Sequence, residues 1–342
     1  MTKSTEPILR VRDLSTRFYA TFGVVHAVDG VSFDLYPGET LGIVGESGSG
    51  KSVTALSILR LVPVPGRIVS GTVELAGQNL FDLDAEAMRR IRGDRLSTVF
   101  QNPMTALNPA LRIGWQLDEA FLAHDHGTKK EARHKTIEAL HAVGIPDALE
   151  RAESYAHEYS GGMRQRIVIA MGMMNNPQLL IADEPTTALD VTIQAQVMEL
   201  MRRLIDEHEM ALILITHNMG VVANMCDRVA VMYAGEIVEE ALIDDLFEDP
   251  RHPYTWALLR SLPSIDEVDT RLPAIPGFPP DMTDKPTGCR FIERCPFAEE
   301  VCAEHPPLVE VAESHKSRCW VAQRGERFAD RDVSLLGGEV LE

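Results

Sequence analysis

The stretch of sequence that decides the fold is LGIVGESGSGKS, residues 41–52, in which a short apolar run stops at a glycine. Its end, GESGSGKS, matches the pattern G-x-x-x-x-G-K-S of a phosphate-binding loop. Glycine at such positions lets the backbone wrap around an anion and turn its N–H groups inward. The apolar run is typical of a buried parallel strand, and helical signals follow from Ser52 to Leu61. The stretch therefore predicts a P-loop nucleotide site in an α/β fold.

Residues of this loop have distinct expected roles. Lys51 would reach the β- and γ-phosphates of a nucleotide, and the Ser52 hydroxyl would ligate Mg²⁺. The following helix would add its positive N-terminal end. A plain glycine-rich turn is the alternative, and the strand and helix on either side argue against it. The residues expected to contact ATP here are Gly45, Glu46, Ser47, Gly48, Ser49, Gly50, Lys51 and Ser52.

Two further apolar runs end in polar residues. LLIADE, residues 179–184, ends in Asp183 and Glu184, at the strand edge where open α/β sheets bind ligands. Asp183 would hold Mg²⁺, directly or through water, and Glu184 would orient or deprotonate an attacking water. LILITHN, residues 212–218, places His217 at the same edge, where it could contact a γ-phosphate. A strand-end cap and a structural histidine are the alternatives for these residues.

Composition limits the class of protein. The 342 residues carry 33 Lys and Arg against 51 Asp and Glu, a formal net charge of −18. This acidity argues against a nucleic-acid partner and against direct docking on anionic lipid. The chain contains no run of about 18 apolar residues, and its start lacks the apolar segment of a signal peptide. We expect a cytoplasmic protein that reaches a membrane only through a protein partner.

Local patterns also predict the domain organisation. Strands that alternate with helices imply a largely parallel sheet covered on both sides. The pattern turns mostly helical at about 102–175, and Pro and Gly become dense after about 245. We expect a nucleotide-binding domain at 6–245, with a helical subdomain at about 102–175, and a C-terminal extension at 246–342.

A further motif, YSGGMRQR at 159–166, begins with Ser-Gly-Gly at a predicted helix start, which is itself an anion site. With GESGSGKS, LLIADE and LITHN in this order, the chain resembles the ATPase subunits of ATP-binding cassette (ABC) transporters over about 8–245. The resemblance implies an α/β P-loop NTPase domain with an antiparallel β subdomain and an inserted helical subdomain. A small Cys-rich C-terminal domain would follow.

The resemblance assigns further site residues. Gln101, in VFQNP, matches a glutamine that senses Mg²⁺, and His217 matches the switch histidine. Together with Glu184, these two residues form the expected catalytic set. The expected Mg²⁺ ligands are Ser52, Gln101 and Asp183. The residues expected to meet ATP across a dimer interface are Ser160, Gly161, Gly162 and Asp190, the last in ALD at 188–190.

The aromatic residue that stacks on adenine in this family aligns best with Phe18, and Tyr19 and His26 are nearby alternatives. A core aromatic without a nucleotide role remains the other interpretation of Phe18. Because the resemblance places part of each ATP site on an opposite subunit, one chain would hold an incomplete site. ATP binding would then join two ATPase domains, and hydrolysis would release them.

Three segments indicate which branch of the ABC transporter family the chain resembles. They are QNPMTALNP at 101–109, PRHPYTWALLRSLP at 250–263, and a four-cysteine tail. Together they resemble D-type ATPase subunits of dipeptide and oligopeptide importers, a branch that includes nickel and opine systems. The implied partners are a second, F-type ATPase subunit, two transmembrane permeases and an extracytoplasmic solute-binding protein. The expected function is ATP-driven peptide uptake at the cytoplasmic membrane face. Nickel, opine or another solute, and a soluble non-transport ABC ATPase, are the alternatives.

The HPYTWALL segment, 252–259, is expected to form an amphipathic helix that packs on the ATPase core. The five cysteines are unevenly distributed: Cys226 stands alone, and four others lie close together in the tail. We expect Cys226 to be a buried apolar side chain. The clustered residues are Cys289, Cys295, Cys302 and Cys319.

In a cytoplasmic chain, clustered cysteines are more often a metal site than a disulfide framework. Four thiolates suit either zinc or an iron–sulfur cluster, and the spacings here lack the close C-x₂-C pair common in zinc sites. The resemblance to D-type subunits implies a [4Fe–4S] cluster on these cysteines, with zinc and free buried thiols as alternatives. We expect a structural role, since a small Pro-rich tail needs a cross-link.

Overall fold

The structure is a computed structural model that describes residues 6–187, 189–261 and 275–332. Residue 188 of the ALD motif, the end of the segment at 250–263 and the first residues of the Pro/Gly-rich stretch lie outside the described residues. The chain forms two compact units. Unit 1 comprises residues up to Arg10, Asp34–Thr40 and Glu74–Ile215, and unit 2 comprises Val11–Phe33, Leu41–Val73 and the chain from Thr216.

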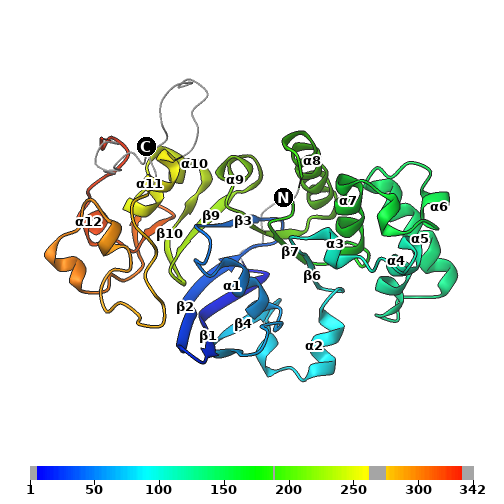
Figure 1. Ribbon diagram of the computed structural model, residues 1–342, viewed down its shortest axis with the longest axis horizontal. Helices are drawn as coiled ribbons and strands as arrows, with labels where there is room; N and C mark the ends of the chain where they lie inside the picture. The colour runs from blue at the N-terminus through cyan, green and yellow to red at the C-terminus, as the bar shows by residue number, and fades with distance from the viewer. Residues whose placement is uncertain (1–5, 188, 262–274, 333–342) are drawn as a thin grey trace. The chain divides into compact units, whose positions relative to one another are not determined.

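Unit 2 contains most of a small sheet in which three long strands are hydrogen-bonded in the order β2-β1-β4 (Figure 1). These strands are β1 (Leu9–Ala20), β2 (Gly23–Leu35) and β4 (Gly66–Leu75). The end of β4 pairs antiparallel with the two-residue β5 (Gln78–Asn79). The chain from Leu9 to Leu35 is therefore almost entirely β-strand.

Unit 2 also contains five strands that neighbour one another in the order β11-β12-β10-β9-β3. They are β3 (Thr40–Val44), β9 (Arg228–Tyr233), β10 (Glu236–Leu242), β11 (Val309–Ala312) and β12 (His315–Ser317). β3 runs parallel to β9, whereas the remaining pairs are antiparallel. Every residue of β3 is buried, as expected for the apolar run before the P-loop. The C-terminal region therefore extends the sheet at β10.

Helices of unit 2 connect these strands. α1 begins directly after Gly50, and α9 begins at an Asn218 side chain that accepts a hydrogen bond from the Val221 N–H. α11 confirms the helix predicted at HPYTWALL, with Tyr254 and Trp256 fully buried. The helices are α1 (Lys51–Ile58), α9 (Met219–Met225), α10 (Ile243–Glu248), α11 (Pro253–Arg260), α12 (Trp320–Gln323), η3 (Ile292–Arg294) and η4 (Glu300–Ala303).

Unit 1 contains a three-stranded parallel sheet in the order β8-β7-β6. Its strands are β6 (Leu96–Val99), β7 (Leu179–Asp183) and β8 (Ala211–Ile215). All of β8 and nearly all of β7 are buried, which matches their continuous apolar sequences. Parallel strands present their carboxyl ends at one edge, so the residue after β7 lies where ligands bind in such sheets.

The segment between β6 and β7 is helical, as predicted for about 102–175. In α5, Thr128 and Glu131 form a reciprocal capping box, which satisfies N–H groups at the helix start. Gly144 follows the helix with φ of 75°, a conformation that glycine adopts readily. The helices of unit 1 are η1 (Leu80–Asp82), α2 (Ala85–Ile91), α3 (Pro103–Ala106), α4 (Ile113–Leu122), α5 (Lys129–Ala142), α6 (Ala148–Arg151), η2 (Ala156–Glu158), α7 (Gly161–Gly172) and α8 (Val191–His208).

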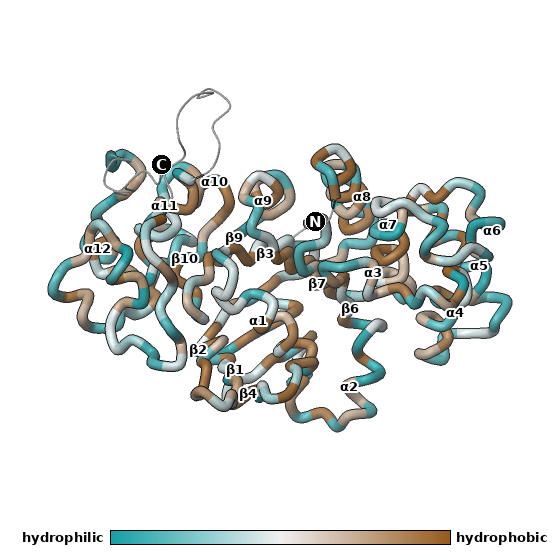
Figure 2. The backbone as a smooth tube through the Cα atoms, in the orientation of Figure 1, coloured by the Kyte–Doolittle hydropathy of each residue, from teal (hydrophilic) through white to brown (hydrophobic). Residues whose placement is uncertain are grey.

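Hydropathy follows these elements. Figure 2 shows hydrophobic residues along β3 and β9, and alternating hydrophobic and hydrophilic residues along α8. The buried residues of α8 recur at helical spacing, as its periodic sequence predicts. Within residues 6–187, 189–261 and 275–332, no helix combines the length and the apolar character needed to cross a bilayer.

Candidate functional site

The predicted site residues are divided between the two units: unit 2 holds the P-loop (residues 45–52) and His217, and unit 1 holds Gln101, Glu184 and the Ser-Gly-Gly segment. In the P-loop, Gly45 has φ of 149° and Gly50 has φ of 102°. A Cβ atom at Gly45 would lie 2.1 Å from the Met232 carbonyl oxygen, and one at Gly50 would lie 2.4 Å from the Ala27 carbonyl oxygen. Both positions therefore require glycine.

Lys51 lies across the loop that precedes it. Its Nζ donates hydrogen bonds to the carbonyl oxygens of Gly45 at 2.8 Å and Glu46 at 2.9 Å. The side chain is buried, with the residue only 6% exposed. The ammonium group is thus placed at the P-loop, close to the backbone that would surround a phosphate. The phosphate contact expected of Lys51 stays a prediction.

In unit 1, Glu184 follows β7 directly and has φ of 47°, in the left-handed region. Its N–H donates to the Ile215 carbonyl oxygen at 2.8 Å, which ties it to the end of β8. Its carboxylate Oε2 accepts hydrogen bonds from Gln101 Nε2 at 2.9 Å and from Thr187 Oγ1 at 2.8 Å. The structure therefore brings together two residues that the sequence placed in separate motifs.

Thr187 is a further residue at this site, and none of the sequence motifs indicates it. Its hydroxyl contacts the same carboxylate oxygen of Glu184 that Gln101 contacts. The available signal was its position three residues after Glu184, within the turn that follows the strand. That spacing is common in turns and points to no particular chemistry by itself.

The Ser-Gly-Gly segment starts α7. Ser160 is the N-cap and accepts a hydrogen bond from the Met163 N–H at 3.3 Å. Ser160 and Gly161 are exposed, whereas a Cβ atom at Gly162 would lie 2.6 Å from Ile193 Cγ2 on α8. Asp190 caps α8 in the same way, accepting from the Ile193 N–H at 3.0 Å. The segment therefore presents a helix N-terminus with polar caps, which attracts anions.

Asp183 is the last residue of β7 in unit 1, whereas His217 and the candidate adenine-stacking residues lie in unit 2. His217 is exposed and precedes the cap of α9. Phe18 packs against Gly66, where a Cβ atom would lie 2.7 Å from the Phe18 ring, and Tyr19 is 45% exposed with the Arg67 guanidinium 5.6 Å from its ring centre. Burial, aided by the charge of Arg17, lowers the pKa of the third alternative, His26. The assignment of an adenine-stacking residue stays a prediction.

The four clustered cysteines line one cavity, and Phe291 forms part of its wall. The Cys289 N–H donates to the Cys302 carbonyl oxygen at 2.9 Å. Burial raises the pKa of the Cys289 thiol to about 12 and that of the Cys319 thiol to about 11, and it raises the pKa of Cys295 as well. The sequence-distant thiols are therefore gathered in one apolar place.

The expectation of a metal site at these cysteines is not confirmed by the structure. Over the part of the chain that the structure describes, no group of three or more His, Cys, Asp or Glu side chains is arranged to hold a metal ion.

Cys226 is buried, as predicted, and its sulfur would lie 3.0 Å from a Cβ atom at Gly42 in β3.

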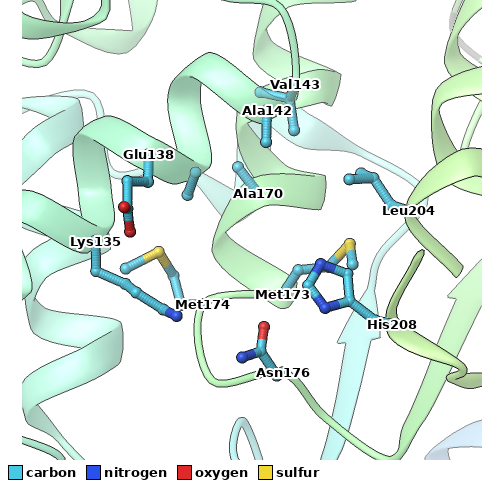
Figure 3. Close-up of a pocket in the computed structure, with 11 residues that line it drawn as sticks. Lys135, Glu138, Ala142, Val143, Ala170, Met173, Met174, Asn176, Leu204 and His208 are labelled. Carbon is cyan, nitrogen blue, oxygen red and sulfur yellow. The ribbon is translucent and has the colours of Figure 1, made fainter.

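A separate pocket of about 190 Å³ lies in unit 1 (Figure 3). Its lining comes from α5, the end of α7 and α8, and includes Met173, Met174 and Leu204. None of the predicted site residues lines it. The pocket is therefore distinct from the P-loop and from Glu184.

Comparisons with known proteins agree with these motifs. The family described as "ABC transporter" matches residues 28–187, and "Oligopeptide/dipeptide transporter, C-terminal region" matches residues 238–302. Oligopeptide transport ATP-binding protein OppD of Bacillus subtilis (strain 168) is 48% identical over 92% of this chain and 88% of its own length. A putative peptide import ATP-binding protein of Brucella abortus (strain 2308) is 49% identical over 92% of this chain and 95% of its own length.

Among solved structures, the ATP-binding cassette MJ0796, in a dimer bound to ADP and phosphate, matches with a TM-score of 0.62 and 26% identity. The match covers 69% of this chain and 98% of that chain. The relatives cover both the motif-bearing region and the C-terminal region, so the likeness is not confined to the P-loop. The chain belongs to the family of ATP-binding subunits of ABC transporters, and hydrolysis of ATP is its reaction.

Proposed function

We propose that this chain is the motor subunit of an importer of dipeptides and oligopeptides, in which ATP hydrolysis drives uptake through partner permeases. The observation that carries the motor role is the hydrogen bond between Gln101 and Glu184 at the end of β7. The peptide substrate is supported by the names of the relatives and by the matched C-terminal region. The proposed domains are residues 6–245 for the motor and 246–342 for the extension.

The proposed reaction is attack by water on the γ-phosphorus of ATP. The bond from that phosphorus to the β–γ bridging oxygen breaks, and ADP leaves with that oxygen. Glu184 accepts the proton of the attacking water, while Gln101 and Thr187 hold its carboxylate in place. Lys51 would neutralise charge on the β- and γ-phosphates.

The oxygen donors of Ser52, Gln101 and Asp183 are of the kind that Mg²⁺ prefers, and we propose them as its ligands. Bound Mg²⁺ would neutralise the charge of the phosphate oxygens during transfer. His217 would contact the γ-phosphate, and the P-loop backbone would surround the β-phosphate. Phe18 is the proposed adenine-stacking residue.

A second ATPase subunit would complete the site. The exposed caps of α7 and α8 in unit 1 would face the γ-phosphate bound by the partner's P-loop, where a helix N-terminus stabilises negative charge. We propose an F-type ATPase partner, two permeases and an extracytoplasmic solute-binding protein. The chain would then sit at the cytoplasmic membrane face through the permeases.

We also propose that Cys289, Cys295, Cys302 and Cys319 hold a [4Fe–4S] cluster, with zinc as the alternative. Support comes from their shared cavity and their all-sulfur donor set. In such a cluster each cysteine binds a different iron, so the ligands stand farther apart than those of one zinc ion. Four thiols that line one cavity without being arranged around one metal ion, as found for the described residues, are compatible with the wider separation of cluster ligands. The cluster would cross-link the C-terminal region.

The substitution Glu184→Gln tests the motor role, because it removes the proton acceptor while keeping the size of the side chain. We expect phosphate release from MgATP to fall at least about 100-fold, while ATP-dependent dimerisation remains. The matched control is Glu207→Gln, the same chemical change at an exposed glutamate on α8. Phosphate release by Glu184→Gln that equals the wild-type rate would contradict the assignment.

The transport role and its substrate need the intact assembly. We expect the chain to copurify with two permeases and a second ATPase, and labelled tripeptide to be taken up by vesicles that contain this assembly and the solute-binding protein. Uptake of nickel or an opine without peptide uptake would assign the alternative substrates. Absence of any permease from the purified material would favour the soluble ATPase class.

A further inference from the structure

The P-loop contains an acidic residue that phosphate binding does not call for. Position 46 is one of the unrestricted positions of the G-x-x-x-x-G-K-S pattern, and here it is Glu46. A carboxylate beside a triphosphate raises the energy of the bound nucleotide through like-charge repulsion, unless another group neutralises it. What surrounds Glu46 therefore matters for nucleotide affinity.

An arginine from the C-terminal region neutralises this carboxylate. Arg294 Nη1 donates to Glu46 Oε2 at 2.7 Å, and Arg294 Nη2 donates to Glu46 Oε1 at 3.0 Å. This two-bond geometry is the strong form of the arginine–carboxylate pair. The Arg294 side chain is only 5% exposed, and the Glu46 side chain is 27% exposed. The pair is therefore largely shielded from water, which preserves its attraction.

Arg294 is itself held rigidly. Its Nε donates to the Pro276 carbonyl oxygen at 2.8 Å, and its guanidinium lies 5.7 Å from the ring centre of Tyr233 and 5.8 Å from that of Phe291. Cation–π contacts and a backbone acceptor fix the guanidinium plane. The arginine is thus a pre-set support for Glu46.

A second contact fixes the backbone of the same residue. The Tyr254 hydroxyl on α11 accepts a hydrogen bond from the Glu46 N–H at 2.8 Å. The Tyr254 ring packs on Tyr233 at 4.7 Å and on Phe291 at 5.5 Å between ring centres. One residue of the P-loop is therefore held by its main chain and by its side chain, in both cases from beyond residue 250.

We propose that Arg294 and Tyr254 are positioning residues of the ATP site, through which the C-terminal region sets the affinity of the P-loop for nucleotide. This inference rests on the proposed binding of ATP by the P-loop. Phe291 and Cys295 line the four-cysteine cavity, and Arg294 lies between them in the chain. The segment that carries Arg294 therefore also forms part of the wall of that cavity.

The first test measures MgATP affinity of the full chain by calorimetry. Arg294→Met keeps the length of the side chain but leaves Glu46 unneutralised, and we expect roughly tenfold weaker binding, which corresponds to ~1.4 kcal/mol. Arg294→Lys keeps the charge without the fork and should lie between Arg294→Met and the wild type. The matched control is Arg324→Met, an exposed arginine of the same region that pairs with Glu299. It should bind MgATP as the wild type does.

A double substitution separates positioning from mere packing. Glu46→Gln combined with Arg294→Met removes both the carboxylate and its partner, so MgATP affinity should recover most of the tenfold loss. A packing defect would not recover. Wild-type affinity in Arg294→Met, or no recovery in the double variant, would overturn the inference.

Tyr254→Phe gives an independent arm that retains the aromatic packing and the Arg294 pair. It leaves the Glu46 N–H without its acceptor, and we expect about threefold to tenfold weaker MgATP binding. If Arg294→Met does not fold, Arg294→Lys and Tyr254→Phe decide the result. A wild-type chain that fails to bind MgATP would instead refute the proposed function.

Discussion

At the scale of single residues, the site depends on backbone conformations that few side chains tolerate. Glu184 adopts φ of 47°, which costs a non-glycine residue on the order of 1 kcal/mol or more. The hydrogen bonds to its N–H and carboxylate maintain that conformation and aim the side chain. The residue type was predictable from the apolar run that ends in Asp-Glu, whereas its conformation and Thr187 contact were not.

Gly50 offers a test at this scale. In Gly50→Ala, the new methyl group would lie 2.4 Å from the Ala27 carbonyl oxygen, at a backbone φ of 102°. We expect the free energy of unfolding to fall by at least about 2 kcal/mol, because strain and steric overlap add. Chemical denaturation monitored by circular dichroism measures this loss.

The control for that experiment is Gly30→Ala. Gly30 also has positive φ, at 72°, but a Cβ atom there would have nothing within 4 Å. Only conformational strain remains, so the loss should be about 1 kcal/mol. Equal losses in the two variants would show that steric overlap at the P-loop contributes nothing.

At the scale of elements, charged side chains connect the C-terminal region to β2 and to the turn before β10. Asp29 on β2 contacts Arg290, and Lys285 Nζ lies 2.6 Å from Asp29 Oδ2. Arg290 also donates to the Ala234 carbonyl oxygen in the turn between β9 and β10. Its side chain is only 1% exposed, so loss of its partners would leave a buried charge unpaired. Ion pairs, and not the apolar core alone, therefore define this contact.

Acid should weaken this contact. Burial favours the neutral form of Asp29, but the hydrogen bond from Lys285 and the charge of Arg290 outweigh it and hold the pKa of Asp29 below its ordinary value. A lower pKa in the folded state stabilises the fold above the unfolded value, and that stabilisation is lost as pH falls through the folded value. Asp29→Asn should thus cost about 1–3 kcal/mol near neutral pH, with a difference from the wild type that shrinks below about pH 4.

Urea denaturation of both proteins across this pH range measures the difference. Asp206→Asn, at an exposed position on α8, is the control and should track the wild type at every pH. A difference for Asp29→Asn that does not vary with pH would mean that the Asp29 charge does not stabilise the fold.

At the scale of the whole molecule, the metal content of the purified protein tests the proposed role of the four-cysteine cavity. Anaerobically purified protein should be brown and contain about four iron and four sulfide per chain, as a [4Fe–4S] cluster requires. Replacement of Cys295 by Ala should reduce the iron content and lower the melting temperature, because a cross-link of the C-terminal region is lost. Cys226→Ala, at the separate buried cysteine, is the control and should keep full iron.

A colourless protein with stoichiometric zinc would assign the alternative metal, and a chain without either would indicate free thiols. The same variants test whether the cavity affects the P-loop, since Arg294 directly precedes Cys295. If the cavity wall holds Arg294 in position, loss of iron should be accompanied by weaker MgATP binding.

Much of the fold was predictable because its signals are short-ranged. The buried strand before the P-loop, the helical region at about 102–175 and the helix at HPYTWALL each follow from patterns within a few residues. The C-terminal strands β11 and β12 were not predictable, because each is very short and forms only by pairing, β12 with β10 and β11 with β12.

The sequence by itself determined the nucleotide chemistry of this protein, because glycines, a lysine and strand-end carboxylates must occur at fixed local spacings to bind phosphate and Mg²⁺. Only the tertiary structure decided what supports that chemistry. Glu46 contacts Tyr254 and Arg294, which lie 208 and 248 positions further along the chain, and Phe291 lines the same cavity as the four cysteines. Such contacts arise from packing of distant elements, which no local pattern encodes.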